Sequence, residues 1–492
     1  MKNKKLLVII GGVVLFLVMA GGWFFSRQNS NRSTNPQPNI IFILTDDLDY
    51  PLMPYMKYTN KLIGQEGASF TNYFVTSSAC CPSRASTFRG QYPHNTGILE
   101  NSPGFEQFYR NGNDESTIAT WMKSVGYKNS FMGKYLNLYP AGVKRSYIPP
   151  GWSDWHAFLY HLSPEFYYAY TMNENGKLVK YYKKAEDYST DVIKNRSIEF
   201  IEKSVKRNSP FFLFISVYAP HGPSEPAPRH SGLYLDAVYP KSPSYHEEDT
   251  SDKPTDILNL RKTGGIFETE EADALFVRRI QSMQAVDEMV RDLVQLLEQN
   301  GQLDNTYIFF TSDNGFHMGE HSLPSGKMLV YEEDIRVPLL IRGPGIQPNS
   351  TVTQMTANID IAPTISELAG AKTANFVDGR SFVRFLKEQQ ATDPNWRKAL
   401  LIETGYLEGV SHVITYRGIR SEKFVYVEYE SGELEFYDLV ADPYEMDNIA
   451  KSLDNETLSI LHSWLEELKT CQAEDCRKAE TDIPEGIKYI QQ

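Results

Sequence analysis

Residues 39–47 read NIIFILTDD, an apolar run that ends in two acidic side chains. The run predicts a strand. Three later stretches have the same character: YKNSFMGKYLN (127–137), PFFLFISVYAPHGP (210–223) and NTYIFFTSDNG (305–315). Because helical stretches alternate with these strands, we predict an α/β fold with a mostly parallel sheet flanked by helices.

Helix signals lie between the predicted strands. STIATWMKSVG (116–126) begins at a Ser cap and ends at Gly126. An amphipathic stretch from about residue 271 to 300 is closed by Gly301. IDIAPTISELAG (359–370) has a Pro in its first turn and a Gly stop, so it predicts a third helix.

The C-terminal part of the chain has a different pattern. VITYRGIRSEKFVYVEYESGELEFYDL (413–439) alternates apolar and polar residues around a hairpin signal at Ser431-Gly432, which predicts a small antiparallel sheet. A predicted helix over 455–470 follows. We therefore place a catalytic domain at 39–394 and an α+β subdomain at 395–492.

The N-terminus predicts export. Three lysines precede an apolar run of about 20 residues within 1–25, long enough to span a bilayer. The run exceeds the usual apolar part of a signal peptide and no A-x-A site follows, which favours an uncleaved transmembrane anchor over a cleaved signal. Residues 26–38 are a polar linker. We expect the protein at the extracellular face of the cell membrane, or secreted.

Composition limits the class of partner. The formal net charge of −13 argues against binding nucleic acid or anionic lipid headgroups, although a small pocket can still be basic. Aromatic residues make up 13% of the chain, which fits either a well-filled core or carbohydrate stacking.

The chain has only 4 cysteines. Cys471 and Cys476 lie five positions apart, and in an exported protein this spacing predicts a local disulfide. A metal pair is the alternative, but no nearby His or Cys completes it. Cys80 and Cys81 are adjacent, and neighbouring cysteines bond only with severe backbone strain.

Polar side chains follow each predicted strand. In an open parallel sheet, groups beyond the carboxyl ends of the strands meet at one rim. The residues concerned are Asp46, Asp47, Lys134, His221, Asp313 and Asn314. The four oxygen-bearing residues among them suit calcium or magnesium, whereas an Asp pair alone could simply cap a helix or line a solvated turn.

The stretch SACCPSR (78–84) predicts an anion site. Pro82 favours the first turn of a helix that Gly90 would end, so Cys80 would lie at a helix N-terminus. A thiolate would be stabilised there, and Arg84 adds a bidentate donor. Four further cations could surround a tetrahedral anion: Lys134, His221, His317 and Lys327.

The residues Cys80-x-Pro82-Ser83-Arg84, followed by ASTFRGQYPHNTG, resemble the signature of the type I sulfatases. The segments GKYLN (133–137), YAPHGP (218–223), DNGFHMG (313–319) and PSGK (324–327) look most like the branch that acts on N-acetylglucosamine-6-sulfate and 6-sulfated heparan. The resemblance covers nearly the whole chain from PNIIFILTDD to YDLVADPYEMDNIA, and it implies an alkaline-phosphatase-like fold.

The resemblance implies a role for each rim residue. Cys80 would become formylglycine through a maturation enzyme, and its hydrate would attack the sulfur of a sulfated carbohydrate. One Ca²⁺ would be held by Asp46, Asp47, Asp313, Asn314 and the modified Cys80. Arg84 would hold the environment of the nucleophile. The sulfate oxygens would be bound by Lys134, His221 and Lys327.

The implied mechanism needs two proton transfers. Lys327 or His317 would protonate the leaving sugar oxygen, and His221 would take the proton that lets the aldehyde reform as sulfate departs. The chain departs from the family at two positions: Asn314 replaces a histidine common in this branch, and Leu136 replaces a histidine found in many arylsulfatases.

Two alternatives remain open. A phosphonate or phosphodiester hydrolase of the same superfamily would use the same nucleophile, and an exported glycan-binding protein would never oxidise Cys80. Smaller expectations are that His94 is a turn residue rather than a substrate contact, that Tyr135 and Asn137 contact substrate, and that 246–256 is a surface loop.

Overall fold

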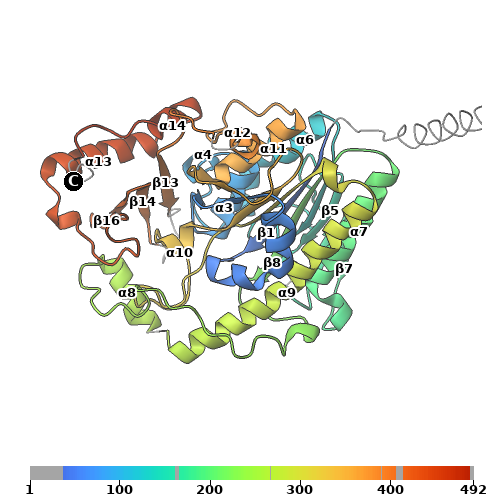
Figure 1. The fold of residues 1–492 in the computed structure, drawn as a ribbon, viewed down its shortest axis with the longest axis horizontal. Helices are drawn as coiled ribbons and strands as arrows, with labels where there is room; N and C mark the ends of the chain where they lie inside the picture. Colours follow the sequence, from blue (N-terminus) through green and yellow to red (C-terminus); the bar gives the residue numbers. More distant parts are fainter. Residues whose placement is uncertain (1–36, 161–165, 266, 389–390, 406–413, 488–492) are drawn as a thin grey trace, which may run out of the picture. The chain divides into compact units, whose positions relative to one another are not determined.

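A ten-stranded sheet organises the protein, whose computed structural model describes residues 37–160, 166–265, 267–388, 391–405 and 414–487 (Figure 1). The predicted anchor or signal segment 1–25, and all but the last two residues of the linker 26–38, lie outside this range. No helix within the described ranges is both long and apolar enough to cross a membrane.

The predicted parallel sheet is confirmed. Its five central strands, β9, β1, β8, β4 and β5, run parallel to one another, and the four predicted strands are the adjacent set β9-β1-β8-β4. In spatial order the strands are β11 (Ser350–Val352), β2 (Ala68–Phe70), β10 (Leu339–Arg342), β9 (Thr306–Ser312), β1 (Asn39–Asp46), β8 (Phe211–Pro220), β4 (Lys128–Gly133), β5 (Asp154–Phe158), β6 (Thr171–Glu174) and β7 (Lys177–Lys180).

Helices cover both faces of the sheet, which is why β1 and β8 are buried along their whole length. Successive residues of β1 point to opposite faces, so Ile40 and Phe42 belong to one core and Ile41 and Ile43 to the other. One face packs against α7 (Ser189–Lys206) and α9 (Thr269–Gln299). The other carries α3 (Cys80–Arg89), α6 (Ile118–Ser124) and α11 (Ile361–Ala369) (Figure 1).

The predicted helices are present, with adjusted ends. α6 is capped by Thr117 rather than Ser116, because Thr117 and Thr120 form a capping box. The predicted helix at 359–370 is divided into a 3-10 turn, Asn358–Asp360, and α11. Gly370 then takes a left-handed φ of 70°, as a helix stop requires.

The predicted antiparallel sheet is also present. It consists of β13 (Ala399–Thr404), β14 (Tyr416–Ser421), β15 (Phe424–Tyr429) and β16 (Leu434–Asp438), with the hairpin turn at Gly432. The helix α13 (Asn455–Leu468) and the short α14 (Glu474–Ala479) follow. The domain boundary near Pro394 stays a prediction.

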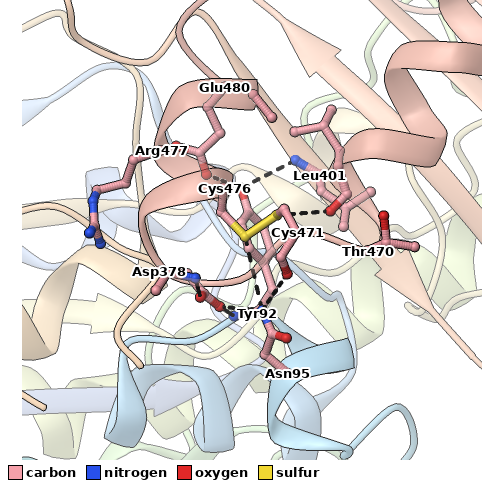
Figure 2. Close-up of a disulfide and its surroundings, with 12 residues drawn as sticks. Tyr92, Asn95, Asp378, Leu401, Thr470, Cys471, Cys476, Arg477 and Glu480 are labelled. Atoms are coloured by element: carbon pink, nitrogen blue, oxygen red, sulfur yellow. Dashed lines mark hydrogen bonds between the residues drawn. A yellow bond between two sulfur atoms is a disulfide. The ribbon is translucent and has the colours of Figure 1, made fainter. Parts of the chain in front are cut away.

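Cys471 and Cys476 form the predicted disulfide, so they are not a metal pair (Figure 2). The carbonyl of Cys471 accepts hydrogen bonds from Asn95 Nδ2 at 2.9 Å and lies 3.0 Å from His94 Nε2, both in α4 (Pro93–Thr96). His94 Nδ1 lies 2.8 Å from Glu403 Oε1. His94 therefore joins α4 to the C-terminal part of the chain.

The predicted surface loop at 246–256 is partly buried. Lys253 Nζ donates to the carbonyls of Glu445 and Met446 at 2.7 and 2.8 Å and pairs with Glu247 at 3.4 Å. Both Glu247 and Lys253 are buried. The acidic composition suggested solvent exposure, but these ionic contacts hold the loop against the segment after β16.

A buried ionic group provides a test of stability. Arg397 pairs with Asp360 and, at 2.8 Å, with Glu480, and all three side chains are fully buried. Replacing Arg397 by Met would leave buried Asp360 without a side-chain cation and Glu480 with only the more distant Arg380, at 3.5 Å. We expect Arg397→Met to lower the free energy of unfolding by about 3–5 kcal/mol, measured by urea denaturation.

The matched control is Arg384→Met in the short helix α12 (Val383–Lys387), where Arg384 forms an exposed pair with Glu388. We expect that change to stay within about 0.5 kcal/mol. Equal losses in the two variants would contradict this account of the buried group.

Candidate active site

The acidic ends of β1 and β9 meet at one edge of the sheet. Because the two strands are parallel neighbours, Asp46 and Asp47 emerge beside Asp313 and Asn314. The backbone N–H of Asp47 donates to Asp313 Oδ1 at 3.2 Å. Asp47 has a left-handed φ of 69°, so the chain turns sharply as it leaves the sheet.

The helix α3 brings Cys80 to the same edge. The helix starts at Cys80 and stops at Gly90, whose φ of 66° favours glycine. Its first turn is fixed by Ser83 Oγ, which donates to the carbonyl of Asp313. Cys80 Sγ lies 3.4 Å from Asp46 Oδ1 and 2.7 Å from Lys327 Nζ. The helix tip and the two acidic motifs therefore share one centre.

The donor atoms at this centre are close together and buried. Asp46, Asp47, Cys80 and Asp313 each offer one ligand atom, and these atoms all lie within 4.8 Å of one another. Asn314 Nδ2 donates to Asp47 Oδ1 at 2.7 Å, whereas its Oδ1 is buried without a hydrogen-bond partner. Three carboxylates and a free amide oxygen fit a hard divalent cation.

Two lysines balance the carboxylates. Lys134 Nζ is paired with Asp46, and Lys327 Nζ is paired with Asp47. Burial alone would raise the pKa of Asp46, but the charges of Lys134, His221 and Arg84 outweigh it and hold the pKa below its ordinary value. The pKa of Asp47 is likewise lowered against burial, mainly by Lys327. Both groups are therefore carboxylates at neutral pH.

Arg84 lies behind the acidic groups. Its Nε donates to Asp313 Oδ2 at 2.7 Å, and one terminal nitrogen donates to Ser216 Oγ at 2.6 Å and to the carbonyl of Lys134 at 2.7 Å. The other terminal nitrogen lies 3.5 Å from Asp46 Oδ2. The predicted anion donor is thus used within the protein, where it orients two carboxylates.

The expectation that Cys80 is stabilised as a thiolate is wrong. Burial, and then the negative charge of Asp46, raise the pKa of the Cys80 thiol to about 12 despite Lys134 and Lys327. A helix N-terminus can lower a thiol pKa, but here desolvation and the neighbouring carboxylate act against it. Unmodified Cys80 is therefore a neutral thiol. Cys81 is a second free cysteine, buried in the core.

The two predicted histidines differ in position. His221 is half-buried, and its Nε2 lies 3.8 Å from Asp47 Oδ2. His317 Nδ1 lies 2.8 Å from Asp334 Oδ1, and its backbone pairs with Gly326, next to Lys327. Among the contacts of the described residues, none joins the His317 side chain to Asp46, Asp47 or Asp313. The structure therefore gathers every predicted site residue except His317 into direct contact.

Tyr135 is not available to a substrate. It is only 2% exposed and packs against Phe88 and Trp155, with ring centroids 5.1 and 5.2 Å away. Sequence reasoning also missed two supports. Ser216 Oγ accepts a hydrogen bond from Arg84, and Arg279 on α9 donates to the carbonyl of Asp47 at 2.6 Å. A signal was present for Ser216, because it is a small polar residue inside an otherwise apolar strand.

Comparison with known proteins agrees with this geometry. Residues 38–371 match the family model described as Sulfatase. The chain belongs to the sulfatase family. It is therefore a sulfuric ester hydrolase. Residues 319–474 of this sulfatase also match the model described as N-sulphoglucosamine sulphohydrolase, C-terminal.

Several curated relatives are similar over most of the sulfatase. The N-acetylglucosamine-6-sulfatase of Capra hircus is 36% identical over 90% of this chain and 85% of its own. The N-acetylglucosamine-6-sulfatase of Homo sapiens is 35% identical over 94% of this chain and 90% of its own. The putative extracellular sulfatase Sulf-1 homolog of Caenorhabditis elegans is 38% identical over 80% of this chain, which spans 55% of that protein.

Solved structures share the fold, which is that of the alkaline-phosphatase-like enzymes. BT4656, solved with its substrate D-glucosamine-2-N,6-O-disulfate, superposes with a TM-score of 0.73 and 26% identity over 91% of this sulfatase and 100% of that chain. A phosphonate monoester hydrolase from Silicibacter pomeroyi superposes with a TM-score of 0.71 and 21% identity over 88% of this chain and 94% of its own. This similarity shows a shared fold.

The burial of Cys80 gives a prediction for protein that still carries the thiol. In the presence of a chelator at pH 8, a pKa of about 12 leaves roughly a thousand-fold less thiolate than an ordinary cysteine would have. We expect iodoacetamide to label Cys80 only after urea unfolding, as followed by peptide mass spectrometry. Rapid labelling of the folded protein at pH 8 would show that the thiol is not held neutral.

Proposed function

We propose that this sulfatase is an exported or membrane-anchored enzyme that hydrolyses 6-sulfate esters of N-acetylglucosamine or related glycans, through a formylglycine made from Cys80. The observation that carries the proposal is the position of Cys80 Sγ, 2.7 Å from Lys327 Nζ and 3.4 Å from Asp46 Oδ1. A maturation enzyme would have to supply the modification. The names of the mammalian relatives and of the sugar bound to BT4656 support the substrate class.

Asp46, Asp47, Asp313 and Asn314 would hold one Ca²⁺ ion. When bound, Ca²⁺ would supply the positive charge that makes a hydroxyl on modified residue 80 acidic and attracts the sulfate group. The fit rests on the buried, unpartnered Asn314 Oδ1 beside three carboxylates. Arg84 and Ser216 would act as positioning residues, because they orient the carboxylates without facing the substrate side.

The two lysines would bind the sulfate oxygens. Lys134 and Lys327 each place an ammonium group next to one of the carboxylates, and Lys327 also contacts Cys80 Sγ. Fixed cations at these positions stabilise the charge that spreads over a transferring sulfuryl group. Lys327 or His317 would protonate the leaving sugar oxygen.

His221 would exchange protons with solvent. It is half-buried beside Asp47, so it can reach both the centre and bulk water. This position supports the role of a base that takes the remaining hydroxyl proton and lets the aldehyde reform. We further propose that 1–25 anchors or exports the chain, that 26–38 is a linker, and that the catalytic domain 39–394 is followed by the subdomain 395–492.

Modification of Cys80 can be tested in protein from a host that matures sulfatases. We expect the peptide spanning Cys80 to have the mass of formylglycine, and Cys80→Ala to lower kcat/KM by at least about 1,000-fold because the nucleophile is lost. The matched control is Cys81→Ala, which leaves the nucleophile in place and should retain activity. An active preparation with an unmodified Cys80 thiol would refute the proposed nucleophile.

Substrate class is a separate prediction. We expect N-acetylglucosamine-6-sulfate to be hydrolysed with a kcat/KM at least about 100-fold higher than that of a phosphodiester or a phosphonate monoester, and EDTA to remove this activity until Ca²⁺ is returned. Steady-state kinetics on the same preparation measures both effects. A preference for the phosphodiester would favour the alternative hydrolase, and an inactive protein whose Cys80 stays a thiol would favour a glycan-binding role.

A further inference from the structure

A second group of potential metal ligands lies outside the active site. His321, Glu333 and Glu445 each offer one nitrogen or oxygen atom, and these atoms lie within 4.8 Å of one another. The group shares no residue with the centre around Cys80. His321 follows the DNGFHMG segment, Glu333 lies in the short helix α10 (Glu332–Ile335), and Glu445 follows β16. We call these three residues the His321 cluster.

Each member of the His321 cluster has one buried polar atom without a hydrogen-bond partner. These atoms are His321 Nε2, Glu333 Oε2 and Glu445 Oε1. His321 is 2% exposed and Glu445 is 1% exposed, so solvent does not satisfy the two groups. Because a buried acceptor without a partner destabilises the fold, three such atoms in one cluster indicate room for a ligand.

The second atom of each side chain is already held by the protein. His321 Nδ1 lies 2.8 Å from Glu247 Oε2, and Glu445 Oε2 accepts from the backbone N–H of Glu332 at 2.9 Å. Glu333 Oε1 is 3.4 Å from Ser244 Oγ. These contacts fix the orientation of each group and leave the other atom free, as the outer contacts of metal ligands do.

The imidazole is in the form that binds metals. Burial, and then the charge of Lys253, lower the pKa of His321 well below its ordinary value. The ring is therefore neutral at physiological pH. A hydrogen on Nδ1 donated to Glu247, 2.8 Å away, would leave the lone pair on Nε2 for a metal ion.

Within the described ranges, no lysine, arginine or histidine forms an ion pair with Glu333 or Glu445. Burial, and then the charge of Glu320, raise the pKa of Glu333 to about 8. Burial, and then the charges of Glu332 and Glu333, raise the pKa of Glu445 well above its ordinary range. The nearby Arg420 is paired with Glu332, and Lys253 with Glu247. A divalent cation would supply a positive charge next to Glu333 and Glu445 that would compensate both carboxylates.

A cavity borders one member of the cluster. Glu333 lines a pocket of about 360 Å³ together with Asp49, Tyr50, Phe316 and Tyr444. The cluster therefore has a cavity on its Glu333 side, where water could complete the coordination of an ion.

We propose that the His321 cluster binds one divalent first-row transition-metal ion, with Zn²⁺ the best fit to one imidazole and two carboxylates. The ion would join three segments that are distant in sequence. It would thereby fix the segment after β16 to α10 and to the loop that leads to Lys327. The site is independent of the modification of Cys80 and of the substrate.

The test uses the full-length protein, stripped with EDTA and returned to excess Ca²⁺ so that the centre around Cys80 is occupied. We expect calorimetric titration with ZnCl₂ to show one bound Zn²⁺ per chain. Glu445→Gln and Glu333→Gln should each weaken this binding by at least about ten-fold. The matched control is Glu248→Gln, an exposed glutamate on the neighbouring loop, which should bind Zn²⁺ like the wild type.

Thermal unfolding gives a second readout that does not depend on activity. Zn²⁺ should raise the Tm of the wild type and of Glu248→Gln, but not of the two cluster variants, because only a ligand of the folded state stabilises it. Crystals grown with Zn²⁺ should show an anomalous peak at His321 Nε2.

Two results would overturn the proposal: no Zn²⁺ binding by the wild type in excess Ca²⁺, or binding that both cluster variants retain unchanged. If Glu445→Gln does not fold, Glu333→Gln decides alone, because Glu333 is half-buried and its loss disturbs the core least.

Discussion

The burial of three adjacent carboxylates is the constraint on which the rest of the site depends. Asp46, Asp47 and Asp313 are 0%, 2% and 1% exposed, and like charges this close repel strongly out of water. Their cations arrive from separate elements: Arg84 from α3, Lys134 from the end of β4, and Lys327 from a loop beyond β9. The charges balance only when the strand order β9-β1-β8-β4 is in place, so the tertiary fold and the electrostatics of the site require each other.

The centre of the fold could be predicted because the signal there is simple. Each central strand is a continuous apolar run, buried on both faces, and its polar residues begin where the strand ends. The strands beyond β10 gave no such signal, since β2 and β11 have only three residues each. β2 pairs with β10 and β11 pairs with β2, so their positions depend on these tertiary contacts rather than on local sequence.

Within the site, sequence identified the groups but not their partners. His317 lies four residues after Asp313, yet Asp334 holds its ring away from the carboxylates. The thiol of Cys80 was expected to ionise because a helix tip attracts negative charge, but the sequence does not reveal how completely neighbouring side chains exclude water. The buried Arg279 was missed because its partners, the carbonyl of Asp47 and the carboxylate of Asp49, are more than 200 positions away in sequence.

The contacts of α4 with the C-terminal disulfide segment also bear on the order in which the protein can assemble. Tyr92, three residues after the end of α3, donates to Glu480 at 2.5 Å, and the neighbouring His94 and Asn95 contact the carbonyl of Cys471 (Figure 2). These partners lie 376 to 388 positions later in the chain, so they are synthesised well after residue 80. The segment carrying Cys80 therefore lacks these contacts in the meantime, and the modifying enzyme proposed above would have this interval to reach a side chain that the folded protein encloses.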